Sequence, residues 1–353
     1  MMEDGSPIIA AMTGAPNVLL RYCGANNASV ITRTSGGEWD VEEAVTESGT
    51  AATGEAGSDY GFVVGYYMGL ALDPSGNPAV AYKDVHTGSI MSDDRRRADL
   101  EFAWKQGGGW QAYPVDFGEG AGDENQLVFD QQGNPIIAYI VPTENLVNNR
   151  QGLWVTRSTD GGTTWDRVRL LGGSLPERPA ITVDDGGTLH VLYYNPELGV
   201  PTLASLTDPE RFEDATQGWT IEVLGDRLFD EGYAPSMKVS PEGHLTVAYY
   251  RCTRSNAELG ACKVDMDGLI FAWRDTRTDR WTYEEVDTGT NPADVDDADL
   301  RNELAFGFCG LEPSLTYNAA GEVIIAYRCE VDDGTRSKRK VSQIKLATRS
   351  LLP

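Results

Sequence analysis

A 14-residue pattern recurs along the chain, and this repeat limits the fold more than any other feature. Five copies align without gaps, and each ends in a tyrosine: 69–82, 126–139, 180–193, 236–249 and 314–327. A degenerate sixth copy, 10–22, ends at Tyr22. Successive copies end 54 to 78 residues apart. Self-similarity at such a period predicts an array of one supersecondary unit.

Each unit reads as four short strands. The aligned pattern predicts a hairpin, because its turn carries Asp, Asn or Pro followed by Gly, as in 73–76 and 184–187, and Gly supplies the positive φ of such turns. A third strand follows, and a fourth opens with Trp, at Trp39, Trp110, Trp165, Trp219 and Trp281. Four antiparallel strands per unit are typical of a propeller blade. We therefore predict an all-β fold, a six-bladed β-propeller of four-stranded antiparallel blades.

The repeat predicts one domain over residues 1–353. The six blades are expected near 6–46, 66–116, 125–171, 178–225, 233–287 and 312–350. The last blade has no Trp strand before Pro353. Two interpretations stay open: this blade is incomplete, or the natural chain continues.

Charge and hydropathy exclude two kinds of partner. Among 353 residues, 29 are Lys or Arg and 54 are Asp or Glu, which gives a net charge of −25. A surface that binds nucleic acid needs clustered Lys and Arg. The longest apolar run, 61–72, has 12 residues, and a membrane helix needs roughly 18. We expect neither nucleic-acid binding nor membrane insertion.

The cysteines bear on the compartment. The chain has five, with no zinc-binding spacing, and residues 1–7 lack the features of a signal peptide. We favour an extracellular, cell-surface or periplasmic protein whose signal lies outside this chain, because the cysteine positions suit disulfides. Intracellular adaptation to salt is the alternative explanation of the acidity.

One turn resembles a known motif. Residues 158–165 match the Asp-box S-x-D-x-G-x-T-W through Ser158, Asp160, Gly162, Thr164 and Trp165. The chain thus resembles sialidase-like (BNR or Asp-box repeat) bacterial β-propeller proteins. The resemblance implies that these five residues are structural, away from the catalytic pocket. It also implies a Phe/Tyr-Arg-Ile-Pro tetrapeptide near the start, which this sequence does not contain.

Loop length points to a working face. The long connections lie between second and third strands and between blades: 84–99, 140–151, 251–268, 330–340, 46–68, 117–125 and 288–312. Successive turns of a blade alternate between its two ends, so both long classes emerge on one face. Long loops on a rigid scaffold commonly carry function.

Disulfides are expected on this long-loop face. Cys252 and Cys262 bracket one loop, and Cys309 and Cys329 are expected on neighbouring strands. Cys23–Cys329 is a competing pair, and five unpaired thiols are the remaining alternative. Closing a loop of this kind stabilises a fold by roughly 2–4 kcal/mol.

Polar and aromatic residues end the second strands at the same face. As candidate ligand-binding residues they are Arg21, Tyr22, Lys83, Asp84, Tyr194, Arg251, Arg328 and Glu330. Converging near the channel mouth, they would suit a polar ligand such as a glycan or an acidic peptide. The alternative is that they pair with one another and only satisfy the rim.

Carboxylates suggest two further kinds of chemistry. Asp294, Asp296, Asp297 and Asp299 offer oxygen ligands for calcium in one loop, and a solvated acidic loop is the competing interpretation. Glycoside hydrolysis needs two carboxyl groups about 5–10 Å apart. The face loops supply several candidates among which the sequence selects no pair: Asp59, Asp84, Asp123, Glu124, Glu231 and Glu330.

Three functional hypotheses follow. The first is a recognition propeller that is not an enzyme and needs no cofactor, binding a glycan or protein on its long-loop face as a module of a larger surface protein. The second is a sialidase-like glycoside hydrolase or polysaccharide lyase. The third is a structural subunit of a larger surface assembly. Absent catalytic signatures favour the first.

Overall fold

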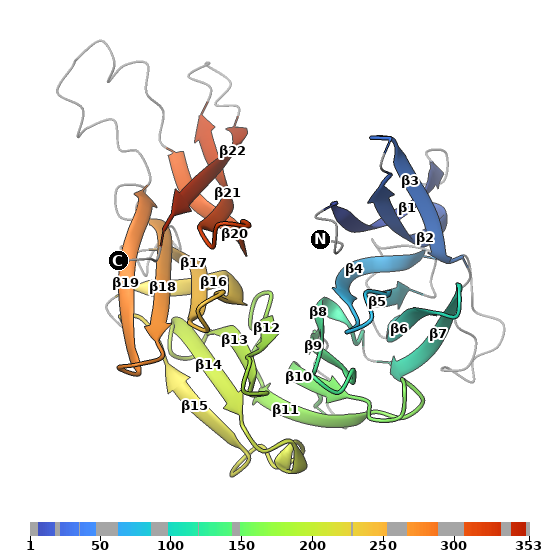
Figure 1. Cartoon of the computed structure of the whole chain (residues 1–353), viewed down its shortest axis with the longest axis horizontal. Helices are drawn as coiled ribbons and strands as arrows, with labels where there is room; N and C mark the ends of the chain where they lie inside the picture. The colour runs from blue at the N-terminus through green and yellow to red at the C-terminus, as the bar shows by residue number, and fades with distance from the viewer. Residues whose placement is uncertain are drawn as a thin grey trace. The chain divides into compact units, whose positions relative to one another are not determined.

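The computed structural model describes residues 6–17, 22–34, 36–46, 63–85, 98–118, 120–142, 149–226, 229–252, 267–288, 307–332 and 340–350. The chain divides into two compact units: residues 1–176 with 206–219, and residues 177–205 with 220–353. Figure 1 shows strands throughout both units. The single domain over 1–353 stays a prediction.

The first unit contains two sheets. One joins the two strand groups of the first two repeats: β1 (Ile8–Asn17), β2 (Tyr22–Arg33), β3 (Trp39–Val45), β4 (Val63–Leu72), β5 (Pro78–Val85), β6 (Ala98–Gln106) and β7 (Gly109–Asp116). The other is a four-stranded sheet: β8 (Asp123–Phe129), β9 (Pro135–Val141), β10 (Gly152–Arg157) and β11 (Asp166–Gly172).

The second unit contains three sheets. The first has four strands: β12 (Ala180–Val183), β13 (Leu189–Asn195), β14 (Val200–Leu206) and β15 (Trp219–Val223). Residues 206–219, which connect β14 to β15, are assigned to the first unit. The next also has four: β16 (Asp230–Val239), β17 (Leu245–Cys252), β18 (Gly268–Asp275) and β19 (Arg280–Thr288). The last has three: β20 (Gly307–Tyr317), β21 (Val323–Asp332) and β22 (Lys340–Arg349).

The strands form the all-β, propeller arrangement that the repeat predicts, but the count of six separate four-stranded sheets is not met. The described strands form five sheets, because Asn26 on β2 pairs in parallel with Val63 on β4 and so merges the first two groups. Within this merged sheet, β1–β3 make a group of three strands. The last sheet, as the missing Trp strand suggested, also has three.

The hairpin turns have the chemistry that the repeat predicts. At all five copies a glycine with φ between +77° and +83° donates its N–H to the carbonyl three residues earlier, over 2.9–3.0 Å: Gly76, Gly133, Gly187, Gly243 and Gly321. Asp73 begins the first of these turns and accepts hydrogen bonds from the backbone N–H groups of Ser75 and Asn77. This local bonding explains why the turn recurs with so few residue types.

The cores lie between neighbouring sheets. In the first unit Phe102, Tyr139 and Trp165 pack together from both sheets. In the second unit, Met237 of β16 packs with Leu203 on one face of the β16–β19 sheet, and Phe271 of β18 packs with Leu315 on the other face. Strands buried on both faces explain the near-continuous apolar second strands, such as β9, which is buried at all seven residues.

Candidate functional site

Lys83 and Asp84, the candidate ligand residues of the first unit whose side chains are described, lie inside the protein. Lys83 is buried; its ammonium group donates to the carbonyl of Gly120 over 2.9 Å and pairs with Asp123. Asp84 is wholly buried. Arg21 lies outside the described residues, as does the side chain of Tyr22. For Lys83 and Asp84, burial favours a structural role.

Two other candidate groups also bond within the protein. Tyr194 stacks on Tyr233 with ring centroids 4.2 Å apart, and both hydroxyls donate to Asp230 over 2.8 Å. Arg328 donates to Glu312 over 3.2 Å and pairs with Glu330. These contacts match the interpretation in which rim residues satisfy one another.

Arg251 belongs to a different setting, a cavity in the second unit. The register of β16 and β17 places Glu231 opposite Arg251. Tyr249 lies two residues earlier on β17, and therefore on the same face of the sheet. Across the sheet, Tyr249 pairs with Ile270 on β18, and Ile270 pairs with Glu285 on β19. Strand pairing thus brings together residues that are far apart in the sequence.

A cavity of about 380 Å³ opens over this row of side chains. The loop between β15 and β16 and the four strands of the sheet contribute its lining: Gly225, Asp226, Phe229, Glu231, Tyr249, Arg251, Ile270, Tyr283, Glu284 and Glu285. Its volume lies within the usual range of small-ligand pockets, which are lined by apolar and aromatic groups with a few polar ones.

Glu231 is the principal ionisable group of the pocket. Burial raises the pKa of Glu231 to about 7; the backbone N–H of Asp226, which donates to its Oε1, and the charge of Arg251 act in the opposite direction, while the charge of Asp226 raises the pKa further. Arg251 itself pairs with Glu285 and lies over the ring of Phe229 at 4.8 Å. Near neutral pH the Glu231 carboxyl can donate or accept a proton.

The hydroxyl of Tyr249 also distinguishes this pocket. Tyr249 is 0% exposed, and its hydroxyl has no hydrogen-bond partner among the described residues. Tyrosines at the same place in two other repeats do have partners. Tyr139 donates to Asp116 over 2.6 Å, and Tyr327 donates to Asp287 over 2.7 Å.

The reason lies six residues after the Trp that opens each fourth strand. Asp116 and Asp287 occupy this position after Trp110 and Trp281, but Gly225 occupies it after Trp219. Gly225 has a φ of +74°, and a Cβ built there would overlap Oε1 of Glu231. The glycine therefore admits the Glu231 carboxyl and leaves the tyrosine hydroxyl without the aspartate partner.

The predicted Asp-box residues form a closely bonded turn. Ser158 Oγ accepts from the backbone N–H of Gly162 over 2.8 Å. Asp160 accepts from both the N–H and the hydroxyl of Thr164 over 2.8 and 2.7 Å, and these bonds hold the pKa of Asp160 below its usual value. Trp165 donates to the carbonyl of Gly162 over 3.0 Å. Every one of these contacts is internal to the turn, which favours a structural role.

The cysteines resolve one alternative. Cys309 and Cys329 form a disulfide between paired positions of β20 and β21, so the competing Cys23–Cys329 pair is absent from this structure. Cys252 is also disulfide-bonded; its predicted partner, Cys262, lies outside the described residues.

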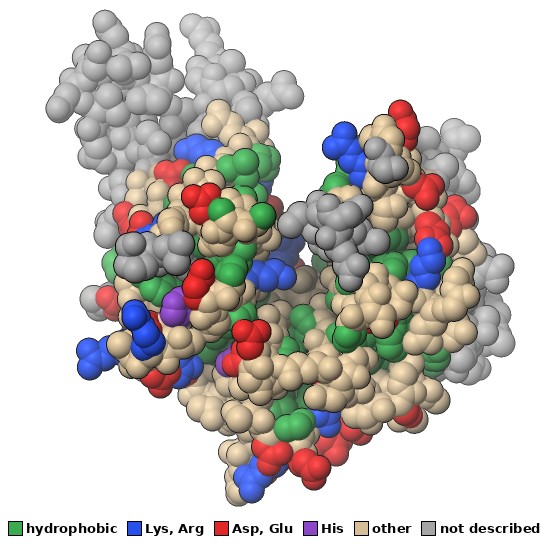
Figure 2. Space-filling model, in the orientation of Figure 1, with side chains coloured by type: hydrophobic (Ala, Val, Ile, Leu, Met, Phe, Trp, Pro, Cys, Tyr) green, Lys and Arg blue, Asp and Glu red, His purple; other side chains and the backbone are tan. Residues whose placement is uncertain are grey.

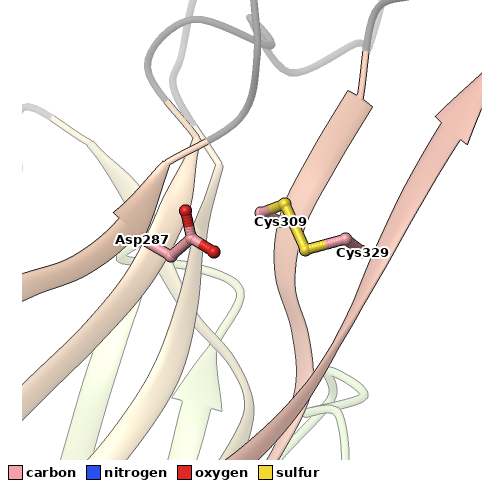
Figure 3. A group of neighbouring side chains, drawn as sticks. All are labelled: Asp287, Cys309 and Cys329. Atoms are coloured by element: carbon pink, nitrogen blue, oxygen red, sulfur yellow. A yellow bond between two sulfur atoms is a disulfide. The ribbon is translucent and has the colours of Figure 1, made fainter. Parts of the chain in front are cut away.

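The calcium site that the sequence predicts stays a prediction. The predicted ligands Asp294, Asp296, Asp297 and Asp299 lie outside the described residues. Asp287, Cys309 and Cys329 place ligand-type atoms within 4.8 Å of one another. Figure 3 shows that the two sulfur atoms are bonded to each other beside the Asp287 carboxylate. Because metals bind thiolates, this disulfide-bonded group is not a metal centre.

Two residues of the pocket lining are among the candidates that the sequence suggests. Arg251 was among the candidate ligand residues, and Glu231 was one of six face-loop acids among which no choice could be made. Tyr249 and Gly225 were not predicted. The available signal is Gly225 at a position where two of the other four Trp strands carry an aspartate, and it is visible only when the ends of these strands are aligned.

Comparison with solved structures shows a sialidase-like propeller fold. The chain matches the Hadza microbial sialidase Hz136 at 14% identity with a TM-score of 0.54, over 99% of this chain and 64% of that one. It matches the NanB sialidase of Streptococcus pneumoniae at 10% identity with a TM-score of 0.55, over 99% of this chain and 67% of that one. It also matches a Trypanosoma rangeli sialidase mutant displaying trans-sialidase activity at 13% identity with a TM-score of 0.52, over 98% of this chain and 52% of that one.

These likenesses concern the fold alone. The chain spans about half to two thirds of the length of these three sialidases. No protein-family model matches the sequence. No curated protein matches it significantly. Within the described residues, no helix is long and apolar enough to cross a membrane.

Proposed function

We propose that the chain is an exported recognition propeller that binds a polar ligand, a glycan or a protein, without transforming it. The pocket around Glu231 is the proposed binding site. The three strands of the first group and the separate sheets that follow suit a six-bladed propeller, and the disulfides suit an oxidising compartment. The role of a module within a larger surface protein is part of this proposal.

The buried, unpartnered hydroxyl of Tyr249 carries the proposal. A buried polar group without a partner costs roughly 1–3 kcal/mol. Such a cost is understandable where a ligand supplies the missing bond. The same pocket offers a carboxyl group, a guanidinium group and exposed aromatic surface on Tyr283. This combination can hold a polar ligand by hydrogen bonds while an aromatic ring covers its apolar part.

A panel experiment tests the binding function. The pure protein is incubated with glycans, polysaccharides and peptides, with and without calcium, and retention and cleavage are read by mass spectrometry. We expect one ligand class to be retained intact, and retention to weaken in Arg251→Gln. The control, Glu242→Gln, changes an acid in the turn at the other end of the β16–β17 hairpin. Absence of all retention contradicts the proposal.

Glycoside hydrolysis is the second candidate, and the protonation of Glu231 favours it. A carboxyl group with a pKa near 7 suits a general acid, and Glu285, paired with Arg251, supplies a second carboxylate in the same pocket. New fragments from the panel, abolished in Glu231→Gln, would establish this function. Unchanged glycans at every pH from about 5 to 8 would exclude it.

A further inference from the structure

The shape and chemistry of the Glu231 pocket identify a more specific ligand. Its walls are largely apolar, formed by Phe229, Ile270 and the rings of Tyr249 and Tyr283. Its polar groups are dominated by carboxylates. Arg251 is the cation of the lining, and it already pairs with Glu285. The described lining also holds Glu231, Asp226 and Glu284, so its carboxyl groups outnumber its cations.

A ligand that carries a positive charge would suit a lining in which carboxyl groups outnumber cations. The whole chain carries a net charge of −25, which repels anionic ligands and attracts basic ones. Figure 2 shows acidic side chains distributed over the surface in view, among fewer basic ones. Burial disfavours the ionised form of Glu231, and a ligand cation beside this carboxyl group would stabilise that form.

The buried hydroxyl is a second and independent observation. The Tyr249 oxygen can accept one hydrogen bond, and it has no partner among the described residues. An ammonium group carries three donors and no acceptor. One ammonium group can therefore donate to both the Glu231 carboxylate and the Tyr249 hydroxyl, which line the same cavity.

The surface beside the pocket favours a peptide over a small amine. Ile221 and Val223, on β15 just before Gly225, are 50% and 37% exposed, and Tyr283 is 44% exposed. Tyr283 accepts a hydrogen bond from the backbone N–H of Gly225 over 3.2 Å, so the end of β15 adjoins the pocket. Apolar residues flanking a basic side chain would find contacts there.

We propose that the Glu231 pocket binds the lysine side chain of a basic, extended segment of a partner protein; this rests on the binding function proposed above. The four-carbon stem of lysine would pack on Phe229, Ile270 and the tyrosine rings, with its ammonium group at Glu231 and Tyr249. A long apolar stem with a cationic head matches an apolar pocket with an acidic end.

The test uses the full chain and the peptide acetyl-Val-Lys-Val-amide. Binding is measured by calorimetry beside two matched peptides, one with Nε-acetyllysine and one with norleucine. We expect only the lysine peptide to bind. Glu231→Gln should weaken binding about tenfold, the size expected for a lost charge-assisted bond. Tyr249→Phe should weaken it by about threefold. Glu242→Gln, the control at the far end of the hairpin, should bind as the wild type does.

Proton release gives a second readout. Glu231 is half ionised at a pH near 7, so binding a cation there should release about half a proton. Calorimetry in two buffers of different ionisation enthalpy measures this number. The charged and titratable groups that line the pocket with Glu231 are Asp226 on the loop, Arg251 and Tyr249 on β17, and Tyr283, Glu284 and Glu285 on β19. Glu231→Gln should abolish the release.

The outcomes separate this inference from the broader function. If glucosamine or another glycan from the panel binds and the lysine peptide does not, the lysine proposal fails while the binding function stands. If the peptide binds Glu231→Gln as tightly as the wild type, the attraction is a general effect of net charge and the pocket assignment fails. If no glycan, protein or peptide binds, both proposals fail.

Discussion

At the scale of single residues, one exchange creates the chemistry of the pocket. A glycine stands at residue 225 where two other repeats carry an aspartate that accepts a hydrogen bond from a buried tyrosine. The space goes to Glu231, which enters the cavity from the next strand. Asp116 and Asp287 each accept a hydrogen bond from a tyrosine. Glu231 instead has a pKa of about 7, so near neutral pH it is partly protonated.

Glu231 should make stability depend on pH. Its pKa is about 7 in the folded protein against an ordinary 4.5, so the folded state binds the proton more tightly than the unfolded state. This contribution to stability is present in full below pH 4.5 and is lost as the pH rises through 7. The loss amounts to roughly 3 kcal/mol.

Glu231→Gln should remove this pH dependence. The amide keeps an oxygen that can accept from the Asp226 N–H but cannot ionise. We expect the variant to match the wild type near pH 5 and to exceed its free energy of unfolding near pH 8. Denaturant titrations at both pH values measure the difference. A constant gap between the two proteins across this range would contradict the raised pKa.

The repeat tyrosines offer a matched comparison. Tyr139→Phe removes a hydrogen bond to the buried carboxylate of Asp116 and should lower the free energy of unfolding by about 1.5–3 kcal/mol. Tyr249→Phe removes a hydroxyl that has no partner among the described residues, so it should be neutral or slightly stabilising. Chemical denaturation of both variants checks this. Equal losses would show that the Tyr249 hydroxyl is bonded in solution.

At the scale of elements, the hairpin turn and the strand row have different origins. Each turn is closed by bonds among five consecutive residues, as from Asp73 to Asn77. The row of side chains that lines the pocket depends instead on how the four strands β16 to β19 pair in register. A shift of one residue in β17 would turn Tyr249 and Arg251 away from the cavity.

Two glycines should respond differently to replacement by alanine. Gly76 has a φ of +82°, and a Cβ there would meet nothing within 4 Å; Gly76→Ala should cost only the backbone strain, about 1 kcal/mol. Gly232 has a φ of +104°, and its Cβ would lie 2.6 Å from the nitrogen of Pro201. Gly232→Ala should cost roughly 3 kcal/mol, since a steric clash adds to the strain.

Thermal unfolding of the two glycine variants measures this contrast. Gly76→Asn serves as a control, because asparagine tolerates positive φ better than alanine; it should be less destabilised than Gly76→Ala. A Gly232→Ala protein as stable as Gly76→Ala would show that β14 and β16 approach each other less closely than described.

At the scale of the whole molecule, the acidic charge is the dominant property outside the fold. A net charge of −25 gives self-repulsion that opposes the compact state. Salt shortens the screening length from about 30 Å at 0.01 M to about 8 Å at 0.15 M. We therefore expect the melting temperature to rise between these two salt concentrations. A fall would mean that attractive ion pairs outweigh the repulsion.

The same charge bears on what the sialidase-like fold does here. Structures of similar fold are sialidases, but a shared propeller does not transfer a substrate. In the second unit, the lining of the described pocket holds more carboxylates than cations. Function on this scaffold is therefore argued from the pocket itself.

The sequence by itself determined the propeller architecture, the repeating turns and the strands that open with Trp. These features depend on short-range chemistry: alternation, glycine at positive φ, and side chains that bond within a few residues. The sequence did not predict that the first two strand groups merge through Asn26 and Val63, because that contact depends on how separate hairpins meet.

Only the tertiary structure decided the pocket. Gly225, Glu231, Tyr249, Arg251 and Glu285 span 61 residues of sequence. Strand register brings them together, and burial then raises the pKa of one carboxyl group and isolates one hydroxyl. Desolvation and missing partners are properties of a packed environment, so no local pattern in the chain expresses them.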